Sequence, residues 1–287
     1  MPFNLNFLNP SAGSNLGGII GDAVRGGSDW QADLQAWTDA VRTGANDFAF
    51  GLTNQVLDGI FHSPFGGEAL SSGPSSSATP YVLPASPAVQ IMSIATVGDV
   101  LDTKVGPANL AGQPYKLVGI PDGIGAYDNP GDTFTILVNH ELAANLGVVR
   151  EHGSVGAFVT KLTVDENTME VVDAQDLIQR VRLFDAGTHA WSAPGTYAFG
   201  RLCSGDLPKE GAFFNAATGK GFNGLLYLNG EEAGNEGKAF AHVVTGSDAG
   251  TSYELPWLGN MSFENVVASP NSGDKTIVFL TDDTSPG

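Results

Sequence analysis

Positive charge and cysteine are both scarce in this chain. It has 13 lysines and arginines against 31 aspartates and glutamates, which gives a formal net charge of -18 at pH 7. Nucleic acids and anionic membranes are bound through basic faces, so we expect neither as a partner. The chain contains 1 cysteine, Cys203, and this excludes an internal disulfide without deciding the compartment.

Long apolar segments are also absent. No stretch approaches the roughly 18–20 apolar residues that a membrane-spanning helix needs, so no membrane span is predicted. The opening residues, MPFNLNFLNPSAGSN, lack the basic start and the apolar run of a standard secretory signal peptide. If the protein is exported, we expect another route.

Short strands dominate from residue 88 to residue 287. Apolar and β-branched runs alternate there with turns rich in Gly, Asn, Asp and Pro, and no long amphipathic helix interrupts them. This pattern is typical of antiparallel hairpins in a sandwich or a propeller. The sequence therefore predicts a mainly β domain over residues 88–287.

Residues 1–63 have a different pattern. Ser28 and Gln31 form a potential capping box, and Trp30, Leu34, Trp37 and Val41 follow at helical spacing. A second helical pattern covers about residues 46–61. We therefore predict a small N-terminal helical segment, which could dock on another surface, and a Gly/Ser/Pro-rich linker over residues 64–87.

Acidic residues recur at the ends of the predicted strands. Glu141 follows one strand, Glu231 and Glu232 follow another, Glu264 lies in a third, and Asp282 and Asp283 end a fourth. Carboxylates gathered on a rigid frame can bind hard cations. The alternative is that these acids only keep the protein soluble.

Three details bear on such a site. Glu231 and Glu232 are adjacent and repel each other, so a cation or an arginine must offset their charge if they are partly buried; the sequence leaves open which one points inward. Cys203 lies in a polar, glycine-containing loop, where it could be a metal ligand or an inert thiol. A nucleophilic role has little support because no histidine lies near it in sequence. His140 is better explained as a hydrogen-bonded residue than as a ligand.

Several motifs occur in an order that resembles one enzyme family. They are VNHEL at 138–142, Cys203, LNGEEAGNEG at 228–237, LGNMSFEN at 258–265 and VFLTDDTSPG at 278–287. In this order they resemble the PhoX-type alkaline phosphatases over about residues 89–287. The resemblance implies a β-propeller of about six blades, Ca²⁺ and Fe³⁺ as cofactors, and hydrolysis of phosphate monoesters.

The resemblance also assigns roles to residues. Cys203 and Glu232 would be iron ligands, Glu264 and Glu141 would be calcium or supporting ligands, and Glu231 would belong to the same metal site. With so few cationic side chains, Arg150 and Arg201 are the best candidates to help the metals bind the phosphate. An extracellular or periplasmic location is expected.

The chain departs from the family pattern at three points. Phe263 replaces the usual histidine before Glu264, and Asp282-Asp283 replaces Glu-Asp. The chain also supplies only about half of the two dozen strands of such a propeller, so we expect an incomplete propeller that associates with itself or with a partner chain. The Phe263 departure and the missing half of the propeller favour the alternative function, a non-catalytic, calcium-stabilised secreted or cell-surface protein.

Overall fold

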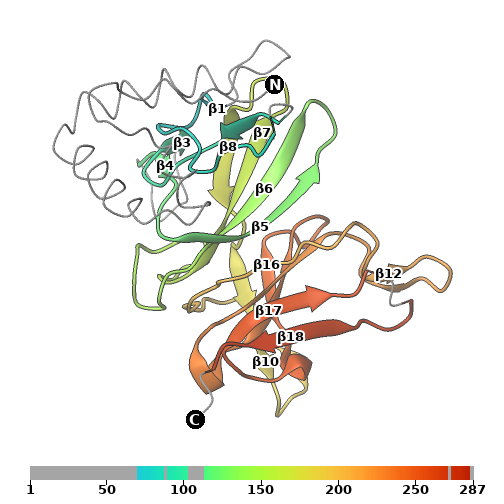
Figure 1. The fold of residues 1–287 in the computed structure, drawn as a ribbon. Helices are drawn as coiled ribbons and strands as arrows, with labels where there is room; N and C mark the ends of the chain where they lie inside the picture. The colour runs from blue at the N-terminus through green and yellow to red at the C-terminus, as the bar shows by residue number, and fades with distance from the viewer. Residues whose placement is uncertain (1–69, 87–88, 103–112, 271–272, 285–287) are drawn as a thin grey trace, which may run out of the picture. The chain divides into compact units, whose positions relative to one another are not determined.

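The structure, a computed structural model, describes residues 70–86, 89–102, 113–270 and 273–284 of the chain (Figure 1). These residues form strands and turns, with short helical turns such as η2 (Gly234–Glu236) and η3 (Pro256–Leu258). The predicted mainly β fold is confirmed. The helices predicted within residues 1–63 lie outside the described residues. No helix in the described part of the chain is long and apolar enough to cross a membrane.

The chain divides into two compact units. One comprises Met1–Leu70 and Val82–Ile91, and the other comprises Ser71–Tyr81 and Met92–Gly287. Part of the predicted linker therefore belongs to the second unit, here called the β unit. Its serines are bonded there: Val171 N–H donates to Ser75 Oγ (2.9 Å), and Ser77 N–H donates to Asp99 (3.1 Å).

The first large sheet of the β unit is an antiparallel meander of four strands. Each strand pairs with the next in the sequence: β5 (Pro121–Asp128), β6 (Thr133–His140), β7 (Phe158–Asp165) and β8 (Val171–Asp176). Successive residues of β6 point to opposite faces, and Leu137 and Val138 enter different apolar clusters. Because both faces are covered, β6 carries apolar residues in succession instead of strict alternation.

The second large sheet has four strands in the order β14-β15-β16-β9. Its strands are β14 (Leu226–Gly230), β15 (Ala239–Val243), β16 (Thr251–Glu254) and β9 (Arg180–Arg182). The first three are antiparallel, whereas β9 lies parallel to β16. Every residue of β15 is buried, as expected for an inner strand.

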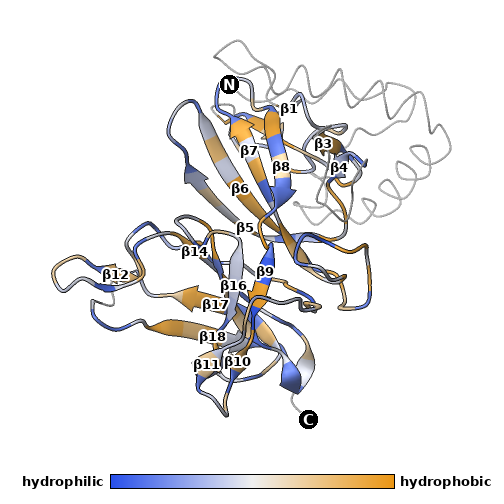
Figure 2. Cartoon of the chain, turned by 180° about the vertical axis from the view of Figure 1, so that it is seen from behind, coloured by the Kyte–Doolittle hydropathy of each residue, from blue (hydrophilic) through white to orange (hydrophobic). Residues whose placement is uncertain are grey.

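The remaining strands form two-stranded sheets. The pairs are β1 (Leu70–Ser72) with β2 (Ile91–Ser93), β3 (Val100–Asp102) with β4 (Tyr115–Lys116), β10 (Phe184–Asp185) with β11 (Ala190–Trp191), β12 (Phe214–Asn215) with β13 (Lys220–Gly221), and β17 (Phe263–Ala268) with β18 (Val278–Asp282). Hydrophobic residues run along β17 and β18 in Figure 2. No closed barrel occurs among the described sheets.

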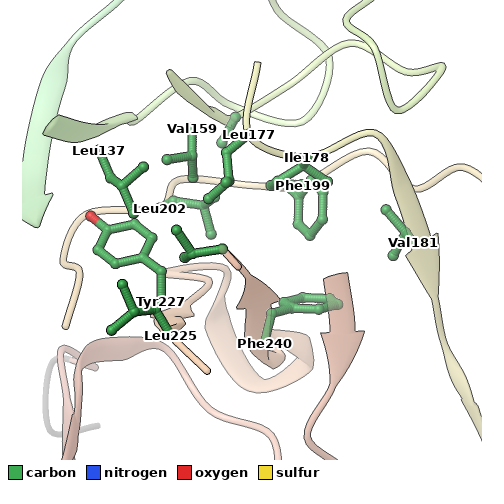
Figure 3. Close-up of a cluster of buried hydrophobic side chains, with 12 residues drawn as sticks. Leu137, Val159, Leu177, Ile178, Val181, Phe199, Leu202, Leu225, Tyr227 and Phe240 are labelled. Carbon is green, nitrogen blue, oxygen red and sulfur yellow. The ribbon is translucent and has the colours of Figure 1, made fainter. Parts of the chain in front are cut away.

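One apolar cluster joins the two large sheets. Leu137 and Val159 come from the first sheet, Tyr227 and Phe240 come from the second, and Phe199 packs with them from the segment between β11 and β12 (Figure 3). Phe199 and Phe240 are both fully buried, with ring centroids 4.9 Å apart. Burying a side chain of this size contributes about 1.5–3 kcal/mol, so the cluster holds the strand ends at fixed positions.

Candidate metal centre

The structure brings together three side chains from distant parts of the sequence. Cys203, Glu232 and Glu264 each offer a potential ligand atom, and these atoms all lie within 4.8 Å of one another. Cys203 is buried, Glu232 is half-buried and Glu264 is exposed, so the group opens to solvent on one side. We call these three residues the thiol–carboxylate cluster.

A β-bulge directs Glu264 toward the cysteine. The pairing of β17 with β18 shifts between Phe263 and Asn265, which leaves Glu264 outside the regular ladder. The Cys203 thiol lies 3.4 Å from the Phe263 carbonyl oxygen and 3.9 Å from Glu264 Oε2. The bulge thereby places a carboxylate of β17 beside a thiol that precedes it by 61 positions.

Two buried asparagines fix the loop that carries Cys203. Asn139 Nδ2 and Asn229 Nδ2 both donate to the Ser204 carbonyl oxygen, at 2.7 and 2.8 Å. Asn229 Nδ2 also lies 3.2 Å from Asn139 Oδ1. These residues belong to the NHE and LNGEE motifs, but they bind backbone. Sequence reasoning missed this role, and the one signal for it was an asparagine in an apolar strand of each motif.

A glycine on β5 supports the same loop. The Gly123 N–H donates to the Cys203 carbonyl oxygen at 3.3 Å. A Cβ atom at this position would lie 2.3 Å from the backbone nitrogen of Gly205, so any larger residue would displace the loop. The close approach of two backbones therefore requires glycine here.

Arg201 connects Glu232 to Glu141. Its Nη1 atom lies 2.7 Å from Glu232 Oε1, and its Nη2 atom lies 2.6 Å from Glu141 Oε1. The Arg201 side chain is 48% exposed, whereas Glu141 and Glu232 are 13% and 11% exposed. The backbone of Arg201 has a φ of 26°, a left-handed value that is uncommon outside glycine.

The cluster carries more negative charge than Arg201 can balance. Burial raises the pKa of the Cys203 thiol to about 12, and Glu264, Glu232 and Glu141 add to the rise. Burial also raises the pKa of Glu232, with Asp283, Glu141 and Glu264 opposing the effect of Arg201. A bound cation would stabilise the deprotonated forms of these groups, and the thiol would lose its proton on binding a metal.

Glu231 faces the other way from Glu232. It is 2% exposed and accepts hydrogen bonds from the Gly200 N–H (2.8 Å), the Tyr197 hydroxyl (3.0 Å) and the Lys238 N–H (3.1 Å). Neighbouring residues of an extended chain point to opposite sides, which separates the two acids. The geometry thus places Glu232 in the cluster and gives Glu231 the role of holding the backbone next to Arg201.

Arg150 lies in a separate, buried network. Its guanidinium pairs with Asp176, donates to the Tyr115 hydroxyl at 3.0 Å and lies 3.7 Å from the centre of the Phe158 ring. The His140 ring stacks on the Phe158 ring with centroids 4.1 Å apart, and its Nε2 lies 2.7 Å from Thr160 Oγ1. His140 is therefore a hydrogen-bonded core residue, and Arg150 is positioned to stabilise the core.

The comparisons found no relative. No protein-family model matches the chain, and neither a curated protein nor a solved structure matches it significantly. The function must therefore be argued from the cluster itself.

The donor set indicates which metals would fit. A thiolate is a soft ligand that suits iron or zinc, whereas carboxylates suit hard cations such as calcium. Cys203, Glu232 and Glu264 combine both kinds. Burial raises the pKa of Asp122, and the negative charge of Glu141 raises it further. These two carboxyl groups are therefore close enough to interact. The residues present therefore fit a transition metal at the thiol, with oxygen ligands at hand for a harder cation.

Proposed function

We propose that this protein is a metal-dependent phosphate-monoester hydrolase of the PhoX type. The observation that carries the proposal is the convergence of Cys203, Glu232 and Glu264, three residues to which the family resemblance assigns metal-binding roles. Residues this far apart in the sequence meet only if the fold brings them together. Their shared donor chemistry is what supports a metal centre.

In this proposal the metals are Fe³⁺ and Ca²⁺. Cys203, Glu232 and Glu264 hold the iron, and Glu141 provides an oxygen ligand on the calcium side. When bound, such ions neutralise a phosphate group and lower the pKa of water. Because the pKa of the Cys203 thiol is raised to about 12, metal binding at the thiol would release its proton, so metal affinity should fall as the pH falls.

Arg201 is the residue we assign to the phosphate. Its planar guanidinium offers paired N–H donors that match phosphate oxygens, and it is half exposed beside the cluster. A cation held by Glu232 would weaken the Arg201–Glu232 pair and leave the Nη1 donors for the substrate, while Nε and Nη2 stay bonded to Glu141. We assign no substrate contact to Arg150, because its guanidinium is buried against Asp176 and Phe158.

The sheets are compatible with part of a propeller. The first large sheet is a four-stranded meander, the arrangement of a propeller blade, and the second contains a three-stranded meander completed by β9. The parallel pairing of β9 departs from a regular blade. We propose that β5–β8 form one propeller blade, that β14–β16 form a second, and that β17–β18 begin a third.

We also propose that the protein is extracellular or periplasmic, as the family resemblance implies.

One observation favours a second candidate, a calcium-stabilised protein without catalysis. Phe263, at the place of the family's histidine, is fully buried and packs with Leu228 and Val266. A Cβ atom on Gly230 would lie 2.3 Å from the Phe263 Cβ, so the ring is tightly enclosed. Phe263 cannot bind a metal, and its packing leaves the centre one ligand short of the family pattern.

Elemental analysis of the purified protein, paired with hydrolysis of p-nitrophenyl phosphate, tests the proposal. We expect iron and calcium together with phosphatase activity, and we expect Cys203→Ala and Glu232→Gln each to lose most of the iron and most of the turnover. Glu166→Gln, in the exposed turn after β7, is the control and should change neither. Calcium without iron or turnover would establish the second candidate instead. Full iron content in Cys203→Ala would show that the thiol is not a ligand.

A further inference from the structure

A group of aromatic side chains lies at the surface of the β unit and shares no residue with the thiol–carboxylate cluster. Phe184 of β10, Trp191 of β11 and Trp257 of η3 pack against one another, with ring centroids 5.5 Å (Phe184–Trp191), 5.1 Å (Phe184–Trp257) and 5.7 Å (Trp191–Trp257) apart. Tyr253 extends the group, 5.6 Å from Trp191. We call these four residues the aromatic cluster.

The backbone around Glu254 holds the aromatic cluster in place. The Trp191 indole N–H donates to the Glu254 carbonyl oxygen at 2.9 Å, and the Phe184 N–H donates to Glu254 Oε2 at 2.9 Å. Glu254 Oε1 is paired with Lys238 Nζ at 3.0 Å. The polar atom of Trp191 is thus already satisfied, so this residue offers mainly its ring to a ligand.

Trp257 is the most unusual member, because 73% of its surface is exposed. Trp191 is also 37% exposed. Tryptophan is buried on average, and exposed apolar groups that gather in one place commonly mark a binding site. A rigid indole that faces water is a preformed surface for a ligand with a flat apolar face.

The ring spacing excludes a cage for an organic cation. A cation enclosed by aromatic faces lies up to about 6 Å from each ring centre, which requires the rings to stand apart. Here Phe184, Trp191 and Trp257 are in mutual contact, with centroids 5.1–5.7 Å apart and no space between them. A ligand would therefore bind on the exposed surfaces of Trp257 and Trp191.

The charge of the protein and the area of the aromatic cluster further limit the class of ligand that could bind. The net charge of -18 disfavours nucleic-acid bases on a phosphate backbone and anionic lipid surfaces. Each aromatic side chain provides about 150–250 Å², so the exposed part of two indoles falls well below the roughly 800 Å² per partner of a stable protein interface. A small, neutral ligand fits both limits.

We propose that the aromatic cluster is a binding site for a neutral carbohydrate. A pyranose ring has a flat face of C–H groups that stacks on an indole, and hydroxyl groups at its edge that form hydrogen bonds. Exposed polar residues of the β10–β11 hairpin, Asp185, Thr188 and His189, lie next to the cluster in the chain and supply donors and acceptors. Asp185 is fixed by the N–H groups of Gly187 (2.7 Å) and Thr188 (3.1 Å).

Isothermal titration of the full chain with cellohexaose, maltohexaose and xylohexaose tests the site. We expect at least one of the three to bind, and Trp257→Ala to weaken that binding about tenfold, which corresponds to about 1.4 kcal/mol. Trp257→Phe should retain part of the affinity because a smaller ring still stacks. Phe279→Ala, which removes a 65% exposed aromatic side chain on β18, is the matched control and should leave binding unchanged.

Several results would overturn the proposal. They are no binding of any of the three sugars, equal binding by Trp257→Ala, or a change from dimer to monomer on Trp257→Ala, which would make the cluster a self-association surface. Sugar binding that persists in Cys203→Ala would show that the site acts independently of the proposed metal centre. The two proposals can therefore fail separately.

Discussion

Arg150 and Arg201 show how differently one residue type is used in two regions of this protein. The Arg150 side chain is 4% exposed and is enclosed by Asp176, Tyr115 and Phe158, which satisfy its charge and its hydrogen bonds. The Arg201 side chain is 48% exposed and is shared between Glu141 and Glu232 in a region of surplus negative charge. The buried arrangement of Arg150 stabilises the core. The exposed arrangement leaves the Arg201 guanidinium able to exchange a carboxylate partner for another anion.

The largest predicted effect is on stability, and it tests whether Arg150 contributes more to the free energy of unfolding than Arg201 does. Arg150→Met removes one partner of a buried ion pair and leaves Asp176 uncompensated, which should lower the free energy of unfolding by about 3–5 kcal/mol. Arg201→Met removes a half-exposed arginine from its pairs with Glu141 and Glu232, where solvent screens the charges, and should cost no more than about 1 kcal/mol. Urea denaturation of both variants measures the difference. Equal losses would show that the two arginines are not used differently.

Metal binding should stabilise the region around Arg201, Glu141 and Glu232, and not the core around Arg150. A ligand at a hundredfold excess over its Kd raises the free energy of unfolding by about 2.7 kcal/mol. We therefore expect a chelator to lower the melting temperature and added calcium to restore it. Glu232→Gln should lose much of this response, while a surface variant such as Glu166→Gln should keep it. A melting temperature that changes with neither chelator nor calcium would argue against a metal that stabilises the fold.

Two buried histidines predict sensitivity to acid. Burial lowers the pKa of His242 from 6.5 to about 3, with the neighbouring His152 adding to the effect. Burial also lowers the pKa of His152 to about 4; Asp176 opposes this change and Arg150 adds to it. The two ring nitrogens of His242 have no hydrogen-bond partner in the described part of the chain. Burial therefore favours the neutral form of both side chains.

The sign of the pH effect follows from these directions. The unfolded chain takes up protons at these histidines near pH 6.5, before the folded chain does, so their contribution to stability is full above that pH and falls as the pH drops toward 4 for His152 and toward 3 for His242. Between pH 7 and pH 5, His242 alone should cost about 2 kcal/mol. His242→Phe should remove that share of the loss, as measured by urea denaturation at both pH values. His189→Gln, on the exposed β10–β11 hairpin, is the control.

The smallest predicted change separates the two adjacent glutamates. Glu231→Gln keeps the shape but loses one acceptor for the Tyr197 and Lys238 donors, which should cost about 1 kcal/mol of stability. Glu232→Gln should change stability less than this in the metal-free protein, yet lose more metal. Thermal melts without metal compare the stability of the two variants, and titrations with metal compare their metal affinity. If Glu232→Gln were the less stable variant and Glu231→Gln the weaker metal binder, the roles assigned to Glu231 and Glu232 would be exchanged.

The sequence predicted some features because they depend on local pattern. Alternating turns and apolar runs predicted the strands, since strand formation is strongly biased by β-branched and apolar residues. The carboxylates at strand ends and Cys203 were recognised by residue type and order. Asn139 and Asn229 were not recognised as supports of the Cys203 loop, because a hydrogen bond to the Ser204 carbonyl depends on where another segment passes.

The amino-acid sequence by itself determined a mainly β protein without an internal disulfide and with a strong negative charge. Only the tertiary structure decided that Glu232 faces Cys203 while Glu231 faces Gly200, that a bulge turns Glu264 toward the thiol, and that Arg150 is enclosed. The physical reason is that adjacent residues of a strand point to opposite sides. Which side becomes a site depends on the segments packed against it, and those lie far away in the sequence.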